Sequence, residues 1–446
     1  MAGLPLILNH GIGTAFAYQG NRPVSADEFL RDVLLLAASL PDRRHIINRC
    51  ANRYRFAVGL AAALLRQQIS LLPPNLTPGM IEQLKSRYPD VYCLADGAIE
   101  PSTLDTIAYV QPSGGAVTAQ TVPVLPATQV AAILFTSGST GQPVPHQKSW
   151  GALVGSALAE IEGLGLKARR GMILVSTVPP QHMYGLESSV LMAMQGGLTL
   201  YSGRPFFPAD ICAELEALPR PRGLVTTPVH LRVLLEAMAE FPPVDFLLCA
   251  TAPLSPQLAA EAELRFSASL HEIYGCTEAG QVATRRPVAT PEWRTLSGIS
   301  MRQDEKGTWV KGGHVETEVL LGDVIELLGP DRILLHGRTT DLVNIAGKRT
   351  SLAYLNYHLN SVEGVRDCAF VMPGEQEDEA VTRLMAFVVA PGITAETIMV
   401  ALRQRIDSAF LPRPLCLVES LPRNETGKLL RRTVEDLVAR HAMKVE

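Results

Sequence analysis

Several features are scarce in this chain of 446 residues, and each absence excludes a class of protein. Charged residues make up 19%, and 40 Lys and Arg stand against 44 Asp and Glu, so the basic excess of nucleic-acid binders is missing. An apolar fraction of 47% excludes a disordered chain. Glycine and proline occur without a period, which excludes a collagen-like repeat. The composition therefore predicts a globular protein of two or three domains.

Patterned cysteines and long apolar runs are also missing. The seven cysteines are widely spaced and never form Cys-x-x-Cys, so we predict reduced thiols and no disulfide framework or zinc site. The longest apolar run, residues 56–65, is half as long as the roughly 20 residues of a membrane-spanning helix. The N-terminus lacks the charged-then-apolar layout of a signal peptide. Together these absences predict a cytoplasmic location without an integral membrane segment.

Short apolar runs alternate with amphipathic ones between residues 130 and 274. The predicted buried strands are 130–136, 172–178, 198–202, 223–227, 246–250 and 270–274. The predicted helices are 150–162, 184–195, 229–239 and 255–266. This alternation predicts an α/β fold, with a mostly parallel sheet covered by helices. Ligands of such sheets bind where strands end, so the loops that follow strands are where chemistry is expected.

The flanking regions have a different pattern. Helical runs occupy 27–40 and 52–68, and proline-containing connections lie at 73–74 and 112–126. The pattern weakens between 287 and 309. After residue 331 the predicted strands are 333–335, 342–345, 365–372 and 383–389. The predicted helices of this region are 352–360 and 394–408. The acidic run 375–379 is interpreted as a hairpin loop. We therefore predict a large domain at residues 1–338 and a small, mobile α+β domain at residues 339–446.

A first candidate segment, Thr136-Ser137-Gly138-Ser139-Thr140-Gly141, follows the predicted strand at 130–136. Its glycines permit tight curvature, and its hydroxyls and backbone N–H groups suit phosphate oxygens. It is not a Walker A loop, because Gln142 and Pro143 follow Gly141 in place of Lys and Ser or Thr. An ordinary turn after a strand is the alternative.

A second segment, Tyr274-Gly275-Cys276-Thr277-Glu278, also stands at a predicted strand end. Its aromatic ring could stack on a base, its hydroxyl could bond a phosphate, and its carboxylate could hold Mg²⁺. Taken singly, Tyr274 could be a core residue and Glu278 an acidic helix start. Together with the first segment, the functional interpretation is favoured.

Two further segments lie nearer the C-terminus. The carboxylate of Asp323 could accept both hydroxyls of a ribose, and Arg338 could add donors, although two ordinary charged turns are the alternative. The polar turn at 424–428 carries Lys428, which is either a surface charge or, if the turn folds into a cleft, a cation for a transferring phosphate.

These four segments, in this order, resemble those of the adenylate-forming superfamily, which contains acyl-CoA synthetases, aryl-acid ligases and peptide-synthetase adenylation domains. The resemblance covers residues 130–430, and its layout includes Asp323 placed 14 residues before Gly337 and an Asn-x-x-Gly-Lys pattern at 424–428. Each motif is weak by itself, whereas four in this order are specific.

The resemblance implies a role for each matching residue. The loop from Thr136 to Gly141 would hold the ATP phosphates, Thr277 would contact the α-phosphate, and Glu278 would bind Mg²⁺. Asp323 and Arg338 would hold the ribose, and His182 would contact the acid. The adenine would be flanked by Thr251, Ala252, Pro253, Tyr274 and Gly275. Lys428 would catalyse adenylation. Rotation of the small domain about Thr340 would then bring residues 344–349 into the site. For His182, an ordinary loop histidine is the alternative.

Three positions depart from the family pattern. Val144 stands where a lysine is usual, and Lys148 could supply that charge instead. Thr340-Asp341 replaces a pair of acids, so the first acid of the family's hinge is missing and the hinge residue is undetermined. Leu321 replaces a threonine before Gly322-Asp323.

The resemblance implies an AMP-forming, ATP-dependent acid–thiol ligase. The short chain and residues 140–148 resemble compact ligases of aryl-polyene and xanthomonadin pigment pathways, which implies a hydroxylated aromatic acid such as 3-hydroxybenzoate and the phosphopantetheine of an acyl carrier protein as acceptor. Arg423, Arg431 and Arg432 could meet an acidic carrier helix or form a solvated face. Free CoA is the alternative acceptor, and a catalytically silent nucleotide-binding scaffold is the alternative from another class of protein.

Overall fold

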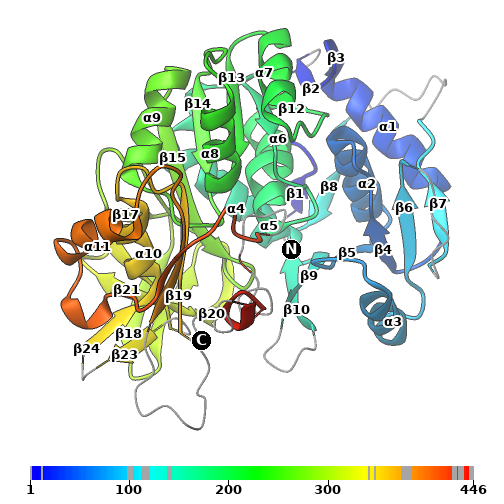
Figure 1. Cartoon of the computed structure of the whole chain (residues 1–446). Helices are drawn as coiled ribbons and strands as arrows, with labels where there is room; N and C mark the ends of the chain where they lie inside the picture. The colour runs from blue at the N-terminus through cyan, green and yellow to red at the C-terminus, as the bar shows by residue number, and fades with distance from the viewer. Residues whose placement is uncertain are drawn as a thin grey trace.

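The computed structural model of the chain describes residues 3–11, 14–97, 104–111, 121–137, 143–339, 342–345, 348–372, 384–423, 429 and 436–440. Within these residues an eleven-stranded sheet and a six-stranded sheet form the bulk of the molecule, and smaller sheets complete it. Figure 1 shows the six-stranded sheet, in blue and cyan, at the opposite side of the molecule from the orange C-terminal elements. The α/β fold class is confirmed.

The six-stranded sheet is formed by the N-terminal part of the chain. Its order is β10 (Pro143–Ser149), β9 (Val130–Ser137), β5 (Ile69–Leu72), β4 (His45–Asn48), β6 (Tyr92–Ala95) and β7 (Thr106–Ala108). All neighbours are parallel except β10, which runs antiparallel to β9. The strand at 130–136 was therefore predicted correctly but assigned to the wrong sheet. Its parallel neighbours β4, β5 and β6 have four residues each, too few to show a period among the helices around them.

The eleven-stranded sheet has a parallel centre and antiparallel edges. Its order is β21 (Asp323–Leu327), β22 (Arg332–Arg338), β17 (Trp293–Thr295), β16 (Gly280–Arg285), β15 (Leu270–Cys276), β14 (Phe246–Cys249), β13 (Arg222–Thr226), β11 (Ile173–Ser176), β12 (Thr199–Tyr201), β2 (Ala15–Gln19) and β3 (Arg22–Ser25). The strands from β15 to β2 are parallel, as predicted for the segment after residue 172. Residues 287–309, where the sequence pattern weakens, also form strands. Among them is β18 (Ser300–Asp304), which pairs with β19 (Gly307–Gly312), and β19 pairs in turn with β20 (Val315–Leu320).

Helices cover both faces of this sheet. On one face α7 (Pro208–Ala217), α8 (Pro228–Ala237) and α9 (Pro256–Phe266) lie side by side and bury one apolar cluster with the strands (Figure 1). On the other, α1 (Ala26–Ser39), α2 (Arg53–Leu65) and α4 (Trp150–Gly163) share a core between the two large sheets. The predicted helix at 184–195 is present as α5 (Met183–Gly185), a π-helical segment η2 (Leu186–Leu191) and α6 (Met192–Gly196). π-helical turns are frequent at functional sites.

The predicted C-terminal strands and helices are present in order. The C-terminal elements are β23 (Leu342–Ile345), β24 (Lys348–Ser351), α10 (Leu352–Asn360), β25 (Asp367–Val371), β26 (Met385–Val389), α11 (Ala395–Arg403) and β27 (Leu415–Leu417). Of these, β24 and β27 were not predicted, and the helix predicted at 394–408 ends at Arg403. The C-terminal elements have an apolar cluster of their own, and the hydroxyl of Ser351 donates to the carbonyl of His336 on β22. The boundary between residues 1–338 and 339–446 stays a prediction, and the acidic run 375–379 lies outside the described residues.

All seven cysteines are free thiols, as predicted. No helix among the described residues is long and apolar enough to cross a membrane. The remaining elements are β1 (Gly3–Pro5) paired with β8 (Val124–Pro126), α3 (Pro78–Arg87), and two single 3-10 turns at Leu166–Ala168 and Ser408–Phe410.

Candidate active site

The loops that carry the candidate residues leave the same edge of the parallel sheet. Strands β11, β13, β14 and β15 are consecutive parallel neighbours, so their carboxyl ends meet. His182 follows β11, Thr251 follows β14, and Thr277 follows β15. Residues up to 95 positions apart in sequence are thereby collected along one edge, as the sequence predicted.

The second candidate segment forms a tight hairpin. Strand β15 pairs antiparallel with β16, and Thr277 and Glu278 occupy the turn between them. Gly275 is required here, because a Cβ atom at this position would lie 2.4 Å from the carbonyl oxygen of Gly280. The helix-start alternative for Glu278 is wrong, since the chain reverses into a strand. The turn instead leaves the Glu278 side chain 37% exposed.

Tyr274, Asp323 and Arg338 come together at the start of this segment. The hydroxyl of Tyr274 donates to Oδ2 of Asp323 at 2.7 Å, and Nε of Arg338 lies 4.0 Å from Oδ1 of the same carboxylate. Asp323 and Arg338 are register partners in the β21–β22 pair, which explains why residues 15 apart meet. Burial, and then the Asp323 carboxylate, raise the pKa of Tyr274, so it stays a neutral donor. The remaining lone pairs of Asp323 suit a diol.

Thr136 and Glu278 meet through a histidine that the sequence did not single out. Nε2 of His146, on β10, lies 2.9 Å from the hydroxyl of Thr136 and 3.6 Å from Oε1 of Glu278. Burial lowers the pKa of His146, and the Glu278 carboxylate opposes this effect. The predicted phosphate-binding segment therefore begins beside the predicted Mg²⁺ ligand. The sequence signal that could have identified this contact is the histidine itself, since His146 lies in the strand that returns antiparallel to β9.

Lys148 also reaches this turn from β10. Its ammonium donates to the backbone carbonyl of Glu278 at 2.5 Å, and the residue is only 7% exposed. Burial lowers its pKa, while carboxylates, Glu187 foremost, oppose that shift. Lys148 is thus linked to the peptide of Glu278.

The segment after β14 is backbone-strained. Thr251 has a φ of 85°, which is rare for a β-branched residue, and such strain gathers at functional sites. Thr251 and Ala252 are half-buried, and Pro253 is exposed.

His182 lies in a segment anchored by a fully buried arginine. It is half-buried and immediately precedes α5. Arg53, from α2, donates to the carbonyl oxygens of Ser176 at 2.9 Å and Val178 at 2.8 Å, at the end of β11. Burial, together with Arg204, lowers the pKa of Arg53 to about 9. The sequence signal for this contact was an arginine, Arg53, at the start of an Ala- and Leu-rich helix that is buried in the core.

Several predicted residues fall outside the described part of the chain. These are Gly138, Ser139, Thr140, Gly141, Thr340, Lys428, Arg431 and Arg432, and of Ser137 only the backbone is described, at the end of β9. The described residues contain no group of three metal-ligating side chains. A single exposed carboxylate such as Glu278 fits Mg²⁺, which is commonly bound by one or two carboxylates and substrate phosphates.

Arg423 is engaged inside the C-terminal region. It donates to both oxygens of Asp367 at 2.8 Å, and Arg232 of α8 lies 3.6 Å from the same carboxylate. The interpretation of Arg423 as part of a solvated or carrier-facing basic surface is therefore not supported.

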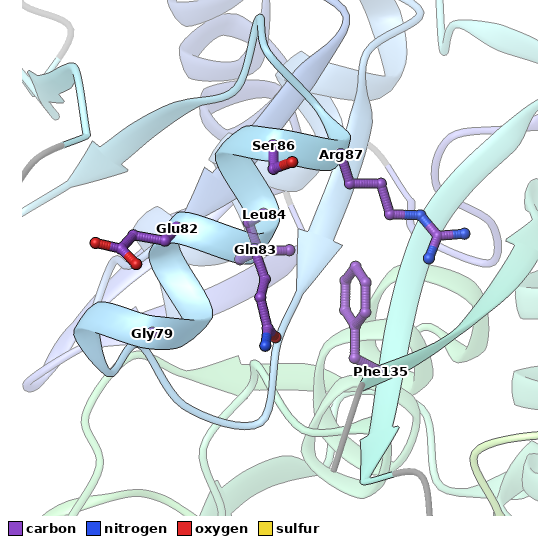
Figure 2. A pocket seen from close by; sticks show the side chains of 7 residues that line it. All are labelled: Gly79, Glu82, Gln83, Leu84, Ser86, Arg87 and Phe135. Atoms are coloured by element: carbon purple, nitrogen blue, oxygen red, sulfur yellow. The ribbon is translucent and has the colours of Figure 1, made fainter. Parts of the chain in front are cut away.

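A separate cavity of about 500 Å³ opens beside α3. Figure 2 shows Arg87 of α3 extending above the ring of Phe135 of β9, whereas Glu82 points away from it. Phe135 immediately precedes Thr136, but the cavity's lining among described residues includes no predicted site residue.

The parallel sheet, its strand-end loops and the small C-terminal region define the fold of adenylate-forming enzymes. The chain belongs to the AMP-binding enzyme family, which matches residues 39–305, and the AMP-binding enzyme C-terminal domain matches residues 358–428.

Curated relatives and solved structures agree with this assignment. A 4-coumarate–CoA ligase of Halorhodospira halophila is 28% identical over 315 residues, 66% of this chain and 73% of the relative. A 3-hydroxybenzoate–CoA/4-hydroxybenzoate–CoA ligase of Thauera aromatica is 23% identical over 392 residues, 78% of this chain and 74% of the relative. The amide bond synthetase McbA of Marinactinospora thermotolerans shares the fold, with a TM-score of 0.79 at 19% identity over 96% of this chain and 97% of that one.

The Asp323 carboxylate predicts a specific effect on nucleotide affinity. Asp323→Ala should raise the KM for ATP about 10- to 100-fold, because hydrogen bonds to a charged group contribute about 1.5–3 kcal/mol. Its kcat should change little. Initial rates of pyrophosphate release against ATP concentration measure this, with Asp331→Ala, in the β21–β22 connection, as the matched control. An unchanged KM for ATP would remove Asp323 from the nucleotide site.

The buried Glu187 predicts a pH-dependent stability. Burial raises its pKa from 4.5 to about 7, so between these values the folded state binds a proton that the unfolded state has released. Stability should therefore fall as the pH rises through this window, by up to about 1.4 kcal/mol per pH unit for this group. Glu187→Gln should show a flatter dependence of Tm on pH between 5 and 7 than the parent. Parallel curves for the two proteins would contradict this prediction.

Proposed function

We propose that the chain activates a hydroxylated aromatic carboxylic acid with ATP and transfers the acyl group to a phosphopantetheine thiol. The observation that supports this most is the convergence on residues 274–278, whose first residue bonds Asp323 and whose last lies beside His146 and Lys148. These contacts bring parts of three separate candidate segments to one strand end. The relatives that are CoA ligases of 4-coumarate and hydroxybenzoates support an aromatic acid and a thiol acceptor.

The proposed first step forms an acyl-adenylate. A carboxylate oxygen of the acid attacks the α-phosphorus of ATP, the bond to the β-phosphate oxygen breaks, and pyrophosphate leaves. Both reactants are anionic, so their approach needs positive charge. Mg²⁺, held by Glu278 and the phosphates, would supply part of this charge, and Lys428 would supply the rest. Thr277 would donate to the α-phosphate, while Asp323 and Arg338 hold the ribose.

In the second step a thiol displaces AMP. The thiol sulfur, as thiolate, attacks the acyl carbon, the bond to the AMP oxygen breaks, and a thioester forms. Because an acyl-adenylate hydrolyses readily, water must be excluded during the first step and the thiol admitted afterwards. Rotation of residues 339–446 is the proposed means.

An aromatic side chain near the ends of β11 and β13 supports an aromatic acid. The exposed ring of Phe206 meets His230 edge-on, at 5.1 Å between centroids. His230 is held in turn by the buried hydroxyl of Thr177, 2.9 Å from its Nδ1. A ring fixed in this way suits contact with an aromatic acid.

Two sources offer the acceptor thiol. The carrier protein predicted from the sequence stays the first candidate. Free CoA is the second candidate, and two observations support it: the relatives named above are CoA ligases, and Arg423 is engaged with Asp367.

One experiment tests the function and separates the acceptors. Acid-dependent pyrophosphate release is measured across aromatic and aliphatic acids, and the best acid is then offered with CoA and with holo-carrier proteins. We expect release with hydroxylated aromatic acids and a thioester detected by mass. A product on CoA alone would assign that acceptor, and a product on carrier alone would assign the other. No release with any acid would instead favour the silent scaffold.

A further inference from the structure

The turn that carries Thr277 and Glu278 is supported from beneath by two buried charged side chains. Lys148, from β10, donates to the carbonyl of Glu278 at 2.5 Å. Glu187, from η2, lies against the first residue of the returning strand, where a Cβ atom on Gly280 would be 3.2 Å from its Oε1. Two ionisable side chains, from elements far apart in sequence, therefore border the same turn.

The direction of the Lys148 side chain follows from the alternation of side chains along β10. From Pro143 to Lys148 the strand keeps a constant register with β9, so successive side chains point to opposite faces of the sheet. Gln147 is exposed, whereas Lys148 is 7% exposed and points to the β15–β16 turn. The lysine is thus directed inward by the local strand geometry.

The Glu187 side chain is fixed equally firmly. It is 1% exposed, and the hydroxyl of Ser156 on α4 donates to its Oε1 at 2.6 Å. A Cβ at Gly280 would lie 3.2 Å from the same oxygen, so the turn passes directly over the carboxylate. The backbone of the turn therefore has little room to shift toward η2.

Burying these charges is costly. Removing an ammonium or a carboxylate from water costs several kcal/mol per ion, and apolar side chains of similar size often replace buried ion pairs without loss of stability. A methionine at position 148 would fill similar space but could not hold the Glu278 carbonyl. A buried ammonium beside a buried carboxyl group is therefore hard to explain as a contribution to the core.

We propose that Lys148 and Glu187 are positioning residues for adenylation, which hold the Thr277–Glu278 turn so that its hydroxyl and carboxylate face the nucleotide phosphates and Mg²⁺. This inference rests on the proposed function. The sequence suggested that Lys148 replaces the family lysine absent at Val144 and contacts a phosphate directly. The present inference instead assigns Lys148 the role of holding the turn. Because the acid would bind at the ends of β11 and β13, the KM for the acid should not depend on the pair.

The test compares Lys148→Met and Glu187→Gln with Leu215→Ala, which removes buried side-chain volume in α7. Calorimetric titration with ATP at several Mg²⁺ concentrations should show about 10- to 100-fold weaker Mg²⁺-dependent binding in the two charge variants, the range typical when a group that orients a metal ligand is lost. Their kcat for pyrophosphate release should fall by a similar factor, with the KM for the acid within about twofold of the parent. Leu215→Ala should keep the parent's Mg²⁺ dependence.

Binding and activity separate this inference from the proposed function. Parent-like Mg²⁺ dependence in both charge variants would overturn the inference even if every protein were active. A parent that binds MgATP but releases no pyrophosphate would overturn the proposed function, and the titration would still decide the positioning role. If Lys148→Met does not fold, Glu187→Gln decides, since it is expected to gain stability near neutral pH. Failure of the parent to bind MgATP would overturn both.

Discussion

Lys428→Ala should lower the rate of acid-dependent pyrophosphate release about 100- to 1000-fold, the usual cost of removing one preorganised electrostatic contact from a transition state. The carboxylate and the α-phosphate repel each other, and the ammonium is the protein cation proposed to offset that repulsion. The substitution should leave ATP affinity nearly unchanged, because Tyr274, Asp323 and Arg338 remain.

The control is Arg403→Ala, which removes an exposed cation from α11 of the same C-terminal region. Single-turnover measurements with saturating acid and ATP report the chemical step directly. A Lys428→Ala protein as fast as the Arg403→Ala protein would show that residues 424–428 do not carry the catalytic cation.

Glu278→Gln should lower the same rate about 100-fold and raise the Mg²⁺ concentration needed for half-maximal activity. The amide keeps the shape of the side chain beside His146 but loses the charge that a hard cation prefers. The backbone carbonyl of Glu278 still accepts from Lys148, so the turn is expected to keep its position.

Activity against Mg²⁺ concentration measures this effect, with Glu261→Gln on the exposed side of α9 as the control. If extra Mg²⁺ restores the full rate, the carboxylate acts in cation affinity alone. If neither the rate nor the Mg²⁺ dependence changes, Glu278 is not the metal ligand.

The limits of the sequence prediction are visible in β9 and β10. The strand at 130–136 was evident from its apolar run, but its sheet was not, because its parallel partner β5 and the next strand β4 are four-residue segments. The returning strand β10 was not predicted either. Its sequence, Pro-Val-Pro-His-Gln-Lys-Ser, contains two prolines and little apolar alternation, yet it pairs with β9 as an edge strand, where proline is tolerated.

The sequence by itself determined the candidate segments of the proposed site, since each is a short contiguous run whose residue types fit phosphate, base, metal or ribose. It also determined the strand–helix order after residue 172, because that pattern is local. Only the tertiary structure decided which side chains support the Thr277–Glu278 turn. The positions of His146, Lys148 and Glu187 depend on the pairing of β10 with β9, a π-helical segment and the meeting of two sheets, and such contacts between distant residues leave no period in the sequence.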